Sequence, residues 1–321
     1  MKSYLYCICS LLGCLFAGPV MSATLPGIPE FIDEMVARHQ FDREELKAVF
    51  ETVDYRPQVI AAISRPSTIK PWLTYRAAFV NARRVKLGLL FWDKHRAALR
   101  RAEKQYGVPQ EIIVALIGVE TIYGQQMGKF RTLDALTTLA FDYPRRAAFF
   151  RDELENYLLL AKAQQFDLFE VKSSYAGALG IPQFMPSSYR KYAVDFNGNH
   201  KIDLLDEPVD AIGSVANYLK EYGWVKGGPV AVHAQVSEGC CSEITKIPRS
   251  LADWQESDVV VSGHLSPQES ARLMDYTVTE GKEYWLGFNN FEVITRYNNS
   301  DFYAMTVYQL ACGLKSARQV N

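Results

Sequence analysis

One glutamate has an unusual place in this chain, because it ends a long apolar stretch. In "IIVALIGVETIYG", residues 112–124, Glu120 is the only charged residue. Ile113, Leu116 and Ile117 precede it by seven, four and three residues, so on a helix they share its face. Burial and the negative end of the helix dipole both raise the pKa of a carboxyl group. Such a carboxyl can act as a general acid, although a buried salt bridge or a solvated helix end are the alternatives.

Two further segments carry polar groups that could bind a sugar. "KSSYAGALGIPQFMPSSYRKYAV", residues 172–194, combines turn-forming glycines with the amide of Gln183. "GFNNFEVITRYNNSDFYAM", residues 287–305, is dense in asparagine and aromatic residues. Aromatic faces beside amides suit carbohydrates, which offer both apolar C–H faces and hydroxyl groups. Ordinary loops can have the same composition, so neither segment alone establishes a carbohydrate-binding site.

A possible calcium loop follows in "DFNGNHKIDLLDEPVD", residues 195–210. Asp195, Asn197 and Asn199 stand at alternate positions, and the backbone carbonyl of Lys201 would be the next ligand, as at the start of an EF-hand. The sixth position, usually glycine, is histidine here, and the twelfth is Asp206 rather than glutamate. The alternative is an asparagine-rich turn without metal.

The elements that would position these groups are mainly helical. Apolar periodicity predicts amphipathic helices from residue 28 to 107, a helix from Pro109 to about residue 123, and further helices up to residue 222. Between residues 227 and 286, alternating and β-branched stretches such as "PVAVHAQV" predict short strands. The last segment, "DFYAMTVYQLACGLKSA", returns to a helical pattern.

The beginning of the chain predicts export. Lys2, an apolar run at residues 4–17 and small residues up to Ala23 are typical of a secretory signal peptide. "LLGC" resembles a lipoprotein box that would leave Cys14 lipidated, whereas "VMSA" resembles an ordinary cleavage site after Ala23. The sequence does not decide between these two processing sites.

Charge and cysteine content exclude other classes of protein. The formal net charge of −1 gives no basic excess, so we expect no nucleic-acid partner. After removal of a signal peptide, Cys240, Cys241 and Cys312 remain, and an odd number implies no disulfide framework. The histidines are scattered without an H-E-x-x-H motif, which disfavours metal-dependent catalysis.

Taken together, "GVETIYG", "SSYAGALGIPQFMPSSY" and "NFEVITRYN" closely resemble the membrane-bound lytic murein transglycosylase B family, also called the soluble lytic transglycosylase 35 family. The resemblance covers nearly the whole mature chain. It implies an α+β, mainly α fold with a lysozyme-like helical core, an extra α-helical domain and a small β-rich domain. The implied divisions are a signal peptide at 1–23 (or a lipoprotein signal ending at 13), an N-terminal α-helical region at 24–107, a catalytic core at 108–226 with the EF-hand-like loop 195–210, a β-rich insertion at 227–286, and a C-terminal segment at 287–321 that returns to the core.

The resemblance also assigns residues. Glu120 would be the sole catalytic acid and base, and the substrate-binding residues would be Tyr75, Ser174, Gln183, Tyr297, Asn298 and Tyr303. A structural Ca²⁺ would be held by Asp195, Asn197, Asn199, Lys201 and a closing aspartate, for which the family register favours Asp210 over Asp206. One departure is Pro182, where a close relative often has glycine before the glutamine.

The implied activity is cleavage of the β-1,4 bond between N-acetylmuramic acid and N-acetylglucosamine in peptidoglycan, with the sugar's own C6 hydroxyl as nucleophile and a 1,6-anhydromuramic end as product. One carboxyl group then suffices, whereas most glycosidases need two. The resemblance places the protein in the periplasm on glycan strands, with a possible lipid anchor to the outer membrane through Cys14. The alternatives are a hydrolytic muramidase and a peptidoglycan-binding protein without catalysis.

Overall fold

The computed structural model describes residues 25–65, 70–237, 247–263 and 265–320. The predicted signal peptide with both cleavage sites, and the pair Cys240 and Cys241, lie outside these residues. The chain divides into two compact units, Met1–Asp54 and Tyr55–Asn321. Within the described ranges, no helix combines the length and the apolar character needed to cross a membrane.

The first unit is a pair of helices, α1 (Ile28–His39) and α2 (Arg43–Glu51). The Asp42 side chain accepts the backbone N–H of Glu45 at 2.8 Å, which satisfies a donor that the start of α2 leaves unpaired. Phe31 and Phe50 meet edge to face with ring centroids 5.9 Å apart. This segment therefore has a small core of its own.

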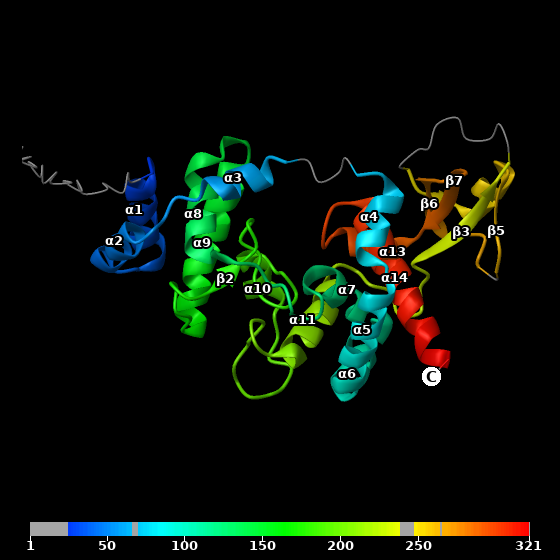
Figure 1. The fold of residues 1–321 in the computed structure, drawn as a ribbon, viewed down its shortest axis with the longest axis horizontal. Coiled ribbons are helices and arrows are strands. Elements are labelled where there is room, and N and C mark those ends of the chain that lie inside the picture. The colour runs from blue at the N-terminus through cyan, green and yellow to red at the C-terminus, as the bar shows by residue number, and fades with distance from the viewer. Residues whose placement is uncertain (1–24, 66–69, 238–246, 264, 321) are drawn as a thin grey trace, which may run out of the picture. The chain divides into compact units, whose positions relative to one another are not determined.

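The second unit is mainly helical (Figure 1). Before its large sheet the described helices are α3 (Pro57–Ile63), α4 (Trp72–Phe79), α5 (Ala82–Lys94), α6 (Arg96–Tyr106), α7 (Gln110–Thr121), α8 (Thr132–Asp142), the 3-10 turn η2 (Pro144–Arg146), α9 (Ala147–Gln164), α10 (Pro186–Tyr192) and α11 (Pro208–Glu221). After the sheet come α13 (Asn289–Thr295) and α14 (Asp301–Val320).

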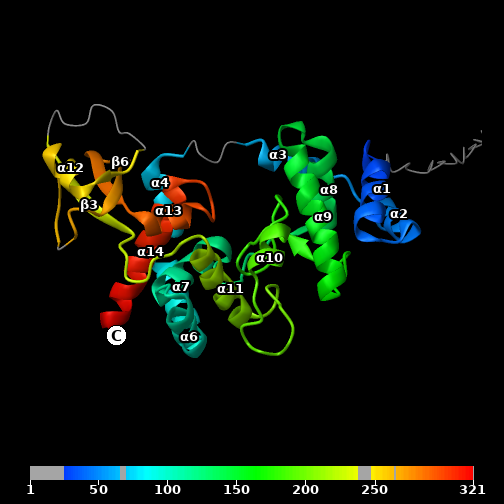
Figure 2. The same ribbon diagram turned by 180° about the vertical axis from the view of Figure 1, so that it is seen from behind.

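Two helical groups can be followed in the figures. Helices α8 and α9 lie side by side, with α3 against α8 (green and light blue in Figure 1). Helix α14 packs on α4, α5, α7 and α13, while α11 packs on α6 and α7, as the reverse view shows (Figure 2). A short ribbon, β1 (Phe130–Arg131) with β2 (Lys172–Ser173), joins the loop after α7 to the loop after α9. Helix α7 is thus surrounded by other helices.

The large sheet is antiparallel, in the order β4-β6-β7-β3-β5. Its strands are β3 (Ala231–Val236), β4 (Arg249–Ser250), β5 (Val259–Val261), β6 (Ser270–Val278) and β7 (Gly281–Gly287), with α12 (Leu251–Glu256) between β4 and β5 in the chain. Leu251 and Trp254 of α12 pack with Leu273 and Leu286 in the core of this sheet. The predicted mainly α fold with a small β-rich part is confirmed.

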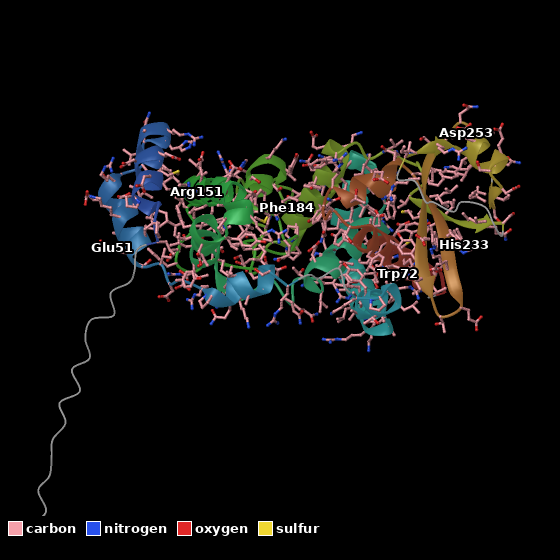
Figure 3. The ribbon with its side chains drawn as sticks, turned by 90° about the horizontal axis from the view of Figure 1, so that it is seen from above. Glu51, Trp72, Arg151, Phe184, His233 and Asp253 are labelled. Carbon is pink, nitrogen blue, oxygen red and sulfur yellow. The ribbon has the colours of Figure 1, made fainter. Side chains whose placement is uncertain are left out.

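Two contacts join the sheet to the helices. Trp72 of α4, labelled in Figure 3, packs against Tyr276 of β6 with ring centroids 4.6 Å apart and donates its indole N–H to Glu283 of β7 at 3.2 Å. The nearly buried Arg272 of β6 donates to Glu292 of α13 at 2.9 Å and to both carboxylate oxygens of Asp301 at 2.9 and 2.7 Å. Since Asp301 is the first residue of α14, Arg272 fixes the start of that helix to the sheet.

We predict that Arg272→Met lowers the free energy of unfolding by about 2 kcal/mol, because it removes a mostly buried, bidentate ion pair whose partners keep some access to water. Urea denaturation followed by circular dichroism measures the change. The control is Lys282→Met, which breaks the more exposed 2.6 Å pair with Asp275 and should lower the free energy of unfolding far less than Arg272→Met does. Equal midpoints for Arg272→Met and the parent protein would contradict the anchoring role.

Candidate active site

Glu120 lies one residue before the end of α7, a helix that is buried on all sides. Every residue from Ile112 to Val119 is buried, as is Thr121, whereas Glu120 keeps partial access to solvent. The predicted limits of this helix, Pro109 to about residue 123, were slightly wrong. Pro109 has an extended backbone and precedes the first turn, and the chain leaves the helix at Thr121.

Three consecutive residues in the left-handed region end α7. Ile122, Tyr123 and Gly124 have φ angles of 52°, 59° and 86°. This conformation is costly for a β-branched residue such as isoleucine, so surrounding contacts must hold it. The Thr121 hydroxyl donates to the carbonyl of Ile181 at 2.8 Å and accepts the N–H of Gly124 at 2.9 Å. The end of the helix is therefore tied to the glycine-rich loop.

Helix α5 holds the same helix end from the other side. The guanidinium of the buried Arg84 donates to the carbonyl of Gly118 and, at 3.4 Å, to that of Val119. The Tyr123 hydroxyl donates to the carbonyl of Arg84 at 2.9 Å. A Cβ at Gly118 would lie 2.5 Å from the Tyr123 hydroxyl, so a larger residue there would require the Tyr123 side chain to move. Sequence reasoning missed Arg84, because one arginine in an amphipathic helix gives no signal that it is buried.

The carboxyl group of Glu120 has a strongly shifted pKa. Burial raises its pKa to about 7, and a hydrogen bond from the Tyr303 hydroxyl to Oε1 acts in the opposite direction. Among the described residues, no second carboxylate contributes to this shift. The expected rise through burial is confirmed. A group with this pKa is present in both protonation states near neutral pH, so it can give and take a proton.

Tyrosines surround the acid. Tyr297, in the turn between α13 and α14, stacks on Tyr303 with ring centroids 6.5 Å apart and planes 12° apart. The Tyr297 hydroxyl donates to the carbonyl of Pro182 in the glycine-rich loop. Tyr75 of α4 packs on Phe302 at 5.7 Å. Burial, followed by the charge of Glu120, raises the pKa of Tyr75, Tyr297 and Tyr303.

One aromatic neighbour was not predicted. Tyr218 of α11 lies 4.8 Å from the Tyr297 ring and 5.4 Å from Phe184, and its hydroxyl donates to the carbonyl of Arg296 at 2.7 Å. In the sequence it occupies an apolar position of a periodic helix, which is also where an ordinary core tyrosine occurs. Only the tertiary packing shows that it supports Tyr297.

The other predicted sugar-binding residues lie on loops. The Ser174 hydroxyl accepts the N–H groups of Ala176 and Ala178 at 3.2 and 3.1 Å. The amide nitrogen of Gln183 donates to the carbonyls of Met127 and Gly180 at 3.1 and 2.9 Å, so this side chain ties two loops together. Asn298 is exposed in the turn before α14. Their contacts with substrate remain predictions.

The candidate calcium loop is ordered by its own side chains. Asp195 accepts the N–H groups of Gly198, Asn199 and His200 at 2.7, 3.1 and 2.8 Å. His200, which replaces the usual glycine, adopts the left-handed conformation that this position needs, with φ 66°. Asn197 and Asn199 accept backbone N–H groups two residues ahead, both at 2.9 Å.

The two possible closing aspartates differ in position. Asp210 is fully buried and accepts the N–H groups of Phe196, Asn197 and Asp203 at 2.9, 3.0 and 3.0 Å, so its oxygens lie against the loop. Asp206 is exposed. In the part of the chain that the structure describes, no three His, Cys, Asp or Glu side chains are grouped as metal ligands, so a cation here would depend on amide and carbonyl oxygens as well.

Comparison with known proteins agrees with this architecture. A family model described as transglycosylase SLT domain matches residues 25–312. The chain belongs to this transglycosylase family. It is 45% identical over 306 residues to membrane-bound lytic murein transglycosylase B of Escherichia coli (strain K12), which covers 92% of this chain and 84% of the relative.

Solved structures of lytic transglycosylases are also similar. Escherichia coli Slt35 in complex with calcium is 45% identical with a TM-score of 0.87, covering 92% of this chain and 95% of that one. Pseudomonas aeruginosa SltB3 in complex with NAG-NAM-pentapeptide is 30% identical with a TM-score of 0.82, covering 89% and 78%. The family resemblance, the lysozyme-like fold and the lytic transglycosylase class predicted from the sequence are confirmed.

We predict that Tyr303→Phe raises the pKa of Glu120 by about one unit above its value of about 7, because the lost hydrogen bond stabilises the charged carboxylate. NMR titration of ¹³C-labelled glutamate side chains, with Glu120→Gln to assign the signal, measures the change. Tyr297→Phe is the matched control. The Tyr297 hydroxyl donates to the carbonyl of Pro182, so its removal should change the pKa of Glu120 much less. An unchanged pKa in Tyr303→Phe would show that this hydrogen bond does not tune the acid.

Proposed function

We propose that this lytic transglycosylase cleaves the β-1,4 bond between N-acetylmuramic acid and N-acetylglucosamine in peptidoglycan, with Glu120 as acid and then base. The observation that carries the proposal is the carboxyl group of Glu120, whose pKa burial raises to about 7 and whose Oε1 accepts a hydrogen bond from the Tyr303 hydroxyl. The murein named for the Escherichia coli relative and the NAG-NAM-pentapeptide held by SltB3 support this substrate.

In the first step, protonated Glu120 donates its proton to the glycosidic oxygen as the bond from C1 breaks. The N-acetyl oxygen of the muramic residue stabilises the positive charge that develops at C1. The Ser174 hydroxyl and the exposed amide of Asn298 would orient this group, while Tyr75 and Tyr297 offer ring faces to the sugars.

In the second step, the C6 hydroxyl of the same sugar attacks C1, and its proton passes to the ionised Glu120. The products are a 1,6-anhydromuramic end and a free N-acetylglucosamine C4 hydroxyl, and the acid is regenerated without water. A hydrolytic glycosidase would ordinarily require a second carboxylate as nucleophile or as base. The pKa of Glu120, raised to about 7 by burial, supports a route in which this group first gives and then takes a proton.

We further propose that the loop 195–210 binds one structural Ca²⁺ through Asp195, Asn197, Asn199, the carbonyl of Lys201 and Asp210. The donors are all oxygens, as a hard cation prefers, and the calcium complex of Slt35 supports the choice of metal. The buried position of Asp210 against the loop supports it over the exposed Asp206. No step of the proposed reaction needs the ion.

The proposed location is the periplasm, with a lipid on Cys14 holding the protein at the outer membrane. The "LLGC" segment and the membrane-bound relative support the anchor. Cleavage after Ala23 would instead release a periplasmic protein without an anchor. Mass spectrometry of the mature N-terminus decides between the two.

We predict that the mature protein releases anhydromuropeptides from purified peptidoglycan, and that Glu120→Gln lowers the rate at least about 10³-fold, because the amide can neither donate nor accept the proton. Mass spectrometry of the soluble products measures both. Products with reducing ends would indicate a hydrolytic muramidase, and binding without any product would indicate a protein without catalysis.

A second prediction concerns the metal. We expect Ca²⁺ to raise the melting temperature of the chelator-treated protein by a few degrees, because the ion binds the folded loop and not the unfolded chain. Asp195→Asn should abolish most of this increase, and Asp206→Asn should keep it. Differential scanning calorimetry with and without Ca²⁺ tests all three proteins. Loss of the increase in Asp206→Asn alone would make Asp206 the closing ligand.

A further inference from the structure

A small cavity in the second unit has cationic side chains as most of its lining residues. Its volume is about 290 Å³, and its lining residues, hereafter the basic pocket, are Arg56, Gln58, Lys129, Phe130 and Arg131. These five residues include three positive charges, one amide and one aromatic ring, and no acid. None of them belongs to the site around Glu120 described above.

A buried aspartate, Asp134, holds the two arginines of the basic pocket in place. Arg56 donates to Oδ2 of Asp134 at 3.0 and 2.8 Å, and Arg131 donates to Oδ1 of the same carboxylate at 2.8 Å. Asp134 is fully buried, so it orients both guanidinium groups without lining the cavity. The ammonium of Lys129 lies 5.9 Å from the Phe130 ring centre. The charges are thus largely preorganised, which lowers the entropy cost of binding an anion.

The basic pocket adjoins the glycine-rich loop. Phe130 pairs with Ser173 in the β1–β2 ribbon, and Ser173 immediately precedes Ser174. At Gly128 a Cβ would lie 2.0 Å from the carbonyl oxygen of Ser173, so the two segments touch. Lys129 follows Glu120 by nine residues in the sequence. A ligand that extends from Ser174 across this ribbon would therefore reach the cations.

We propose that the basic pocket binds a carboxylate of the peptide stem attached to N-acetylmuramic acid. This inference rests on the proposed function. N-acetylglucosamine is uncharged, and the lactyl carboxyl of N-acetylmuramic acid becomes a neutral amide where a stem is attached, so a stem-bearing glycan offers no anionic group of its own to these cations. The stem begins at the lactyl group of the muramic residue and ends in a carboxylate, and arginine and lysine are the usual partners of that group. The stem would select which muramic residue lies beside Glu120.

The test measures binding in the Glu120→Gln protein, so that the probe is not consumed. Isothermal titration calorimetry compares NAG-NAM-pentapeptide with the same molecule whose peptide carboxylates are converted to amides. We expect amidation to weaken binding about fivefold to tenfold. Adding Lys129→Glu should weaken binding of the acidic probe by a similar factor and leave the amidated probe within about twofold. Lys129 is exposed, so this change leaves the buried pairs of Asp134 intact.

The control is Lys104→Glu on α6, an exposed lysine of the same unit that changes the net charge equally. It should leave both affinities within about twofold. Equal binding of the two probes, an equal loss of both in Lys129→Glu, or binding of neither would overturn the inference. These outcomes do not depend on turnover, whereas failure of the proposed function would appear separately as absence of anhydro products from the parent protein.

Discussion

The free-energy cost of burying a charged carboxylate at the end of α7 is the constraint on which the rest of the site depends. Glu120 could become an ordinary carboxylate if water surrounded it, but α7 is enclosed by α5, α11 and α14. Burial therefore opposes the charged form, and the Tyr303 hydroxyl returns part of the lost stabilisation. The balance gives a pKa of about 7. Neither burial alone nor the hydrogen bond alone would place it there.

This balance makes the site depend on parts of the chain far from Glu120. Tyr303 is on α14, 183 residues later, and its place follows from where that helix begins. Arg272 in the sheet fixes this point through Asp301, two residues before Tyr303. Phe302, between them in sequence, packs on both Trp72 and Tyr276. The sheet thus positions the acid's partner, although none of its strand residues bonds Glu120 in the described structure.

Sequence reasoning could find the groups whose signal is local. Glu120 stood alone in an apolar run, and the calcium loop has alternate oxygen-bearing residues. It could not find Arg84 or Tyr218, because their roles arise from contacts with segments 34 and 78 residues away. It also placed the end of α7 too late, since a glycine at 124 is visible in the sequence, whereas left-handed Ile122 and Tyr123 depend on tertiary contacts. Local sequence patterns therefore predict the helices and the reactive groups, whereas tertiary packing determines which other residues support them and where α7 ends.

The pKa of Glu120 also bears on why one acid can serve both halves of the proposed reaction. A glycosidase with two carboxyl groups can keep one protonated and the other ionised by separating their pKa values. A single group must be a competent acid before bond cleavage and a competent base after it. A strongly raised pKa would favour the first role and weaken the second, and an ordinary value would do the reverse. A value near the working pH is the compromise that both steps tolerate, and it requires burial and the Tyr303 hydrogen bond together.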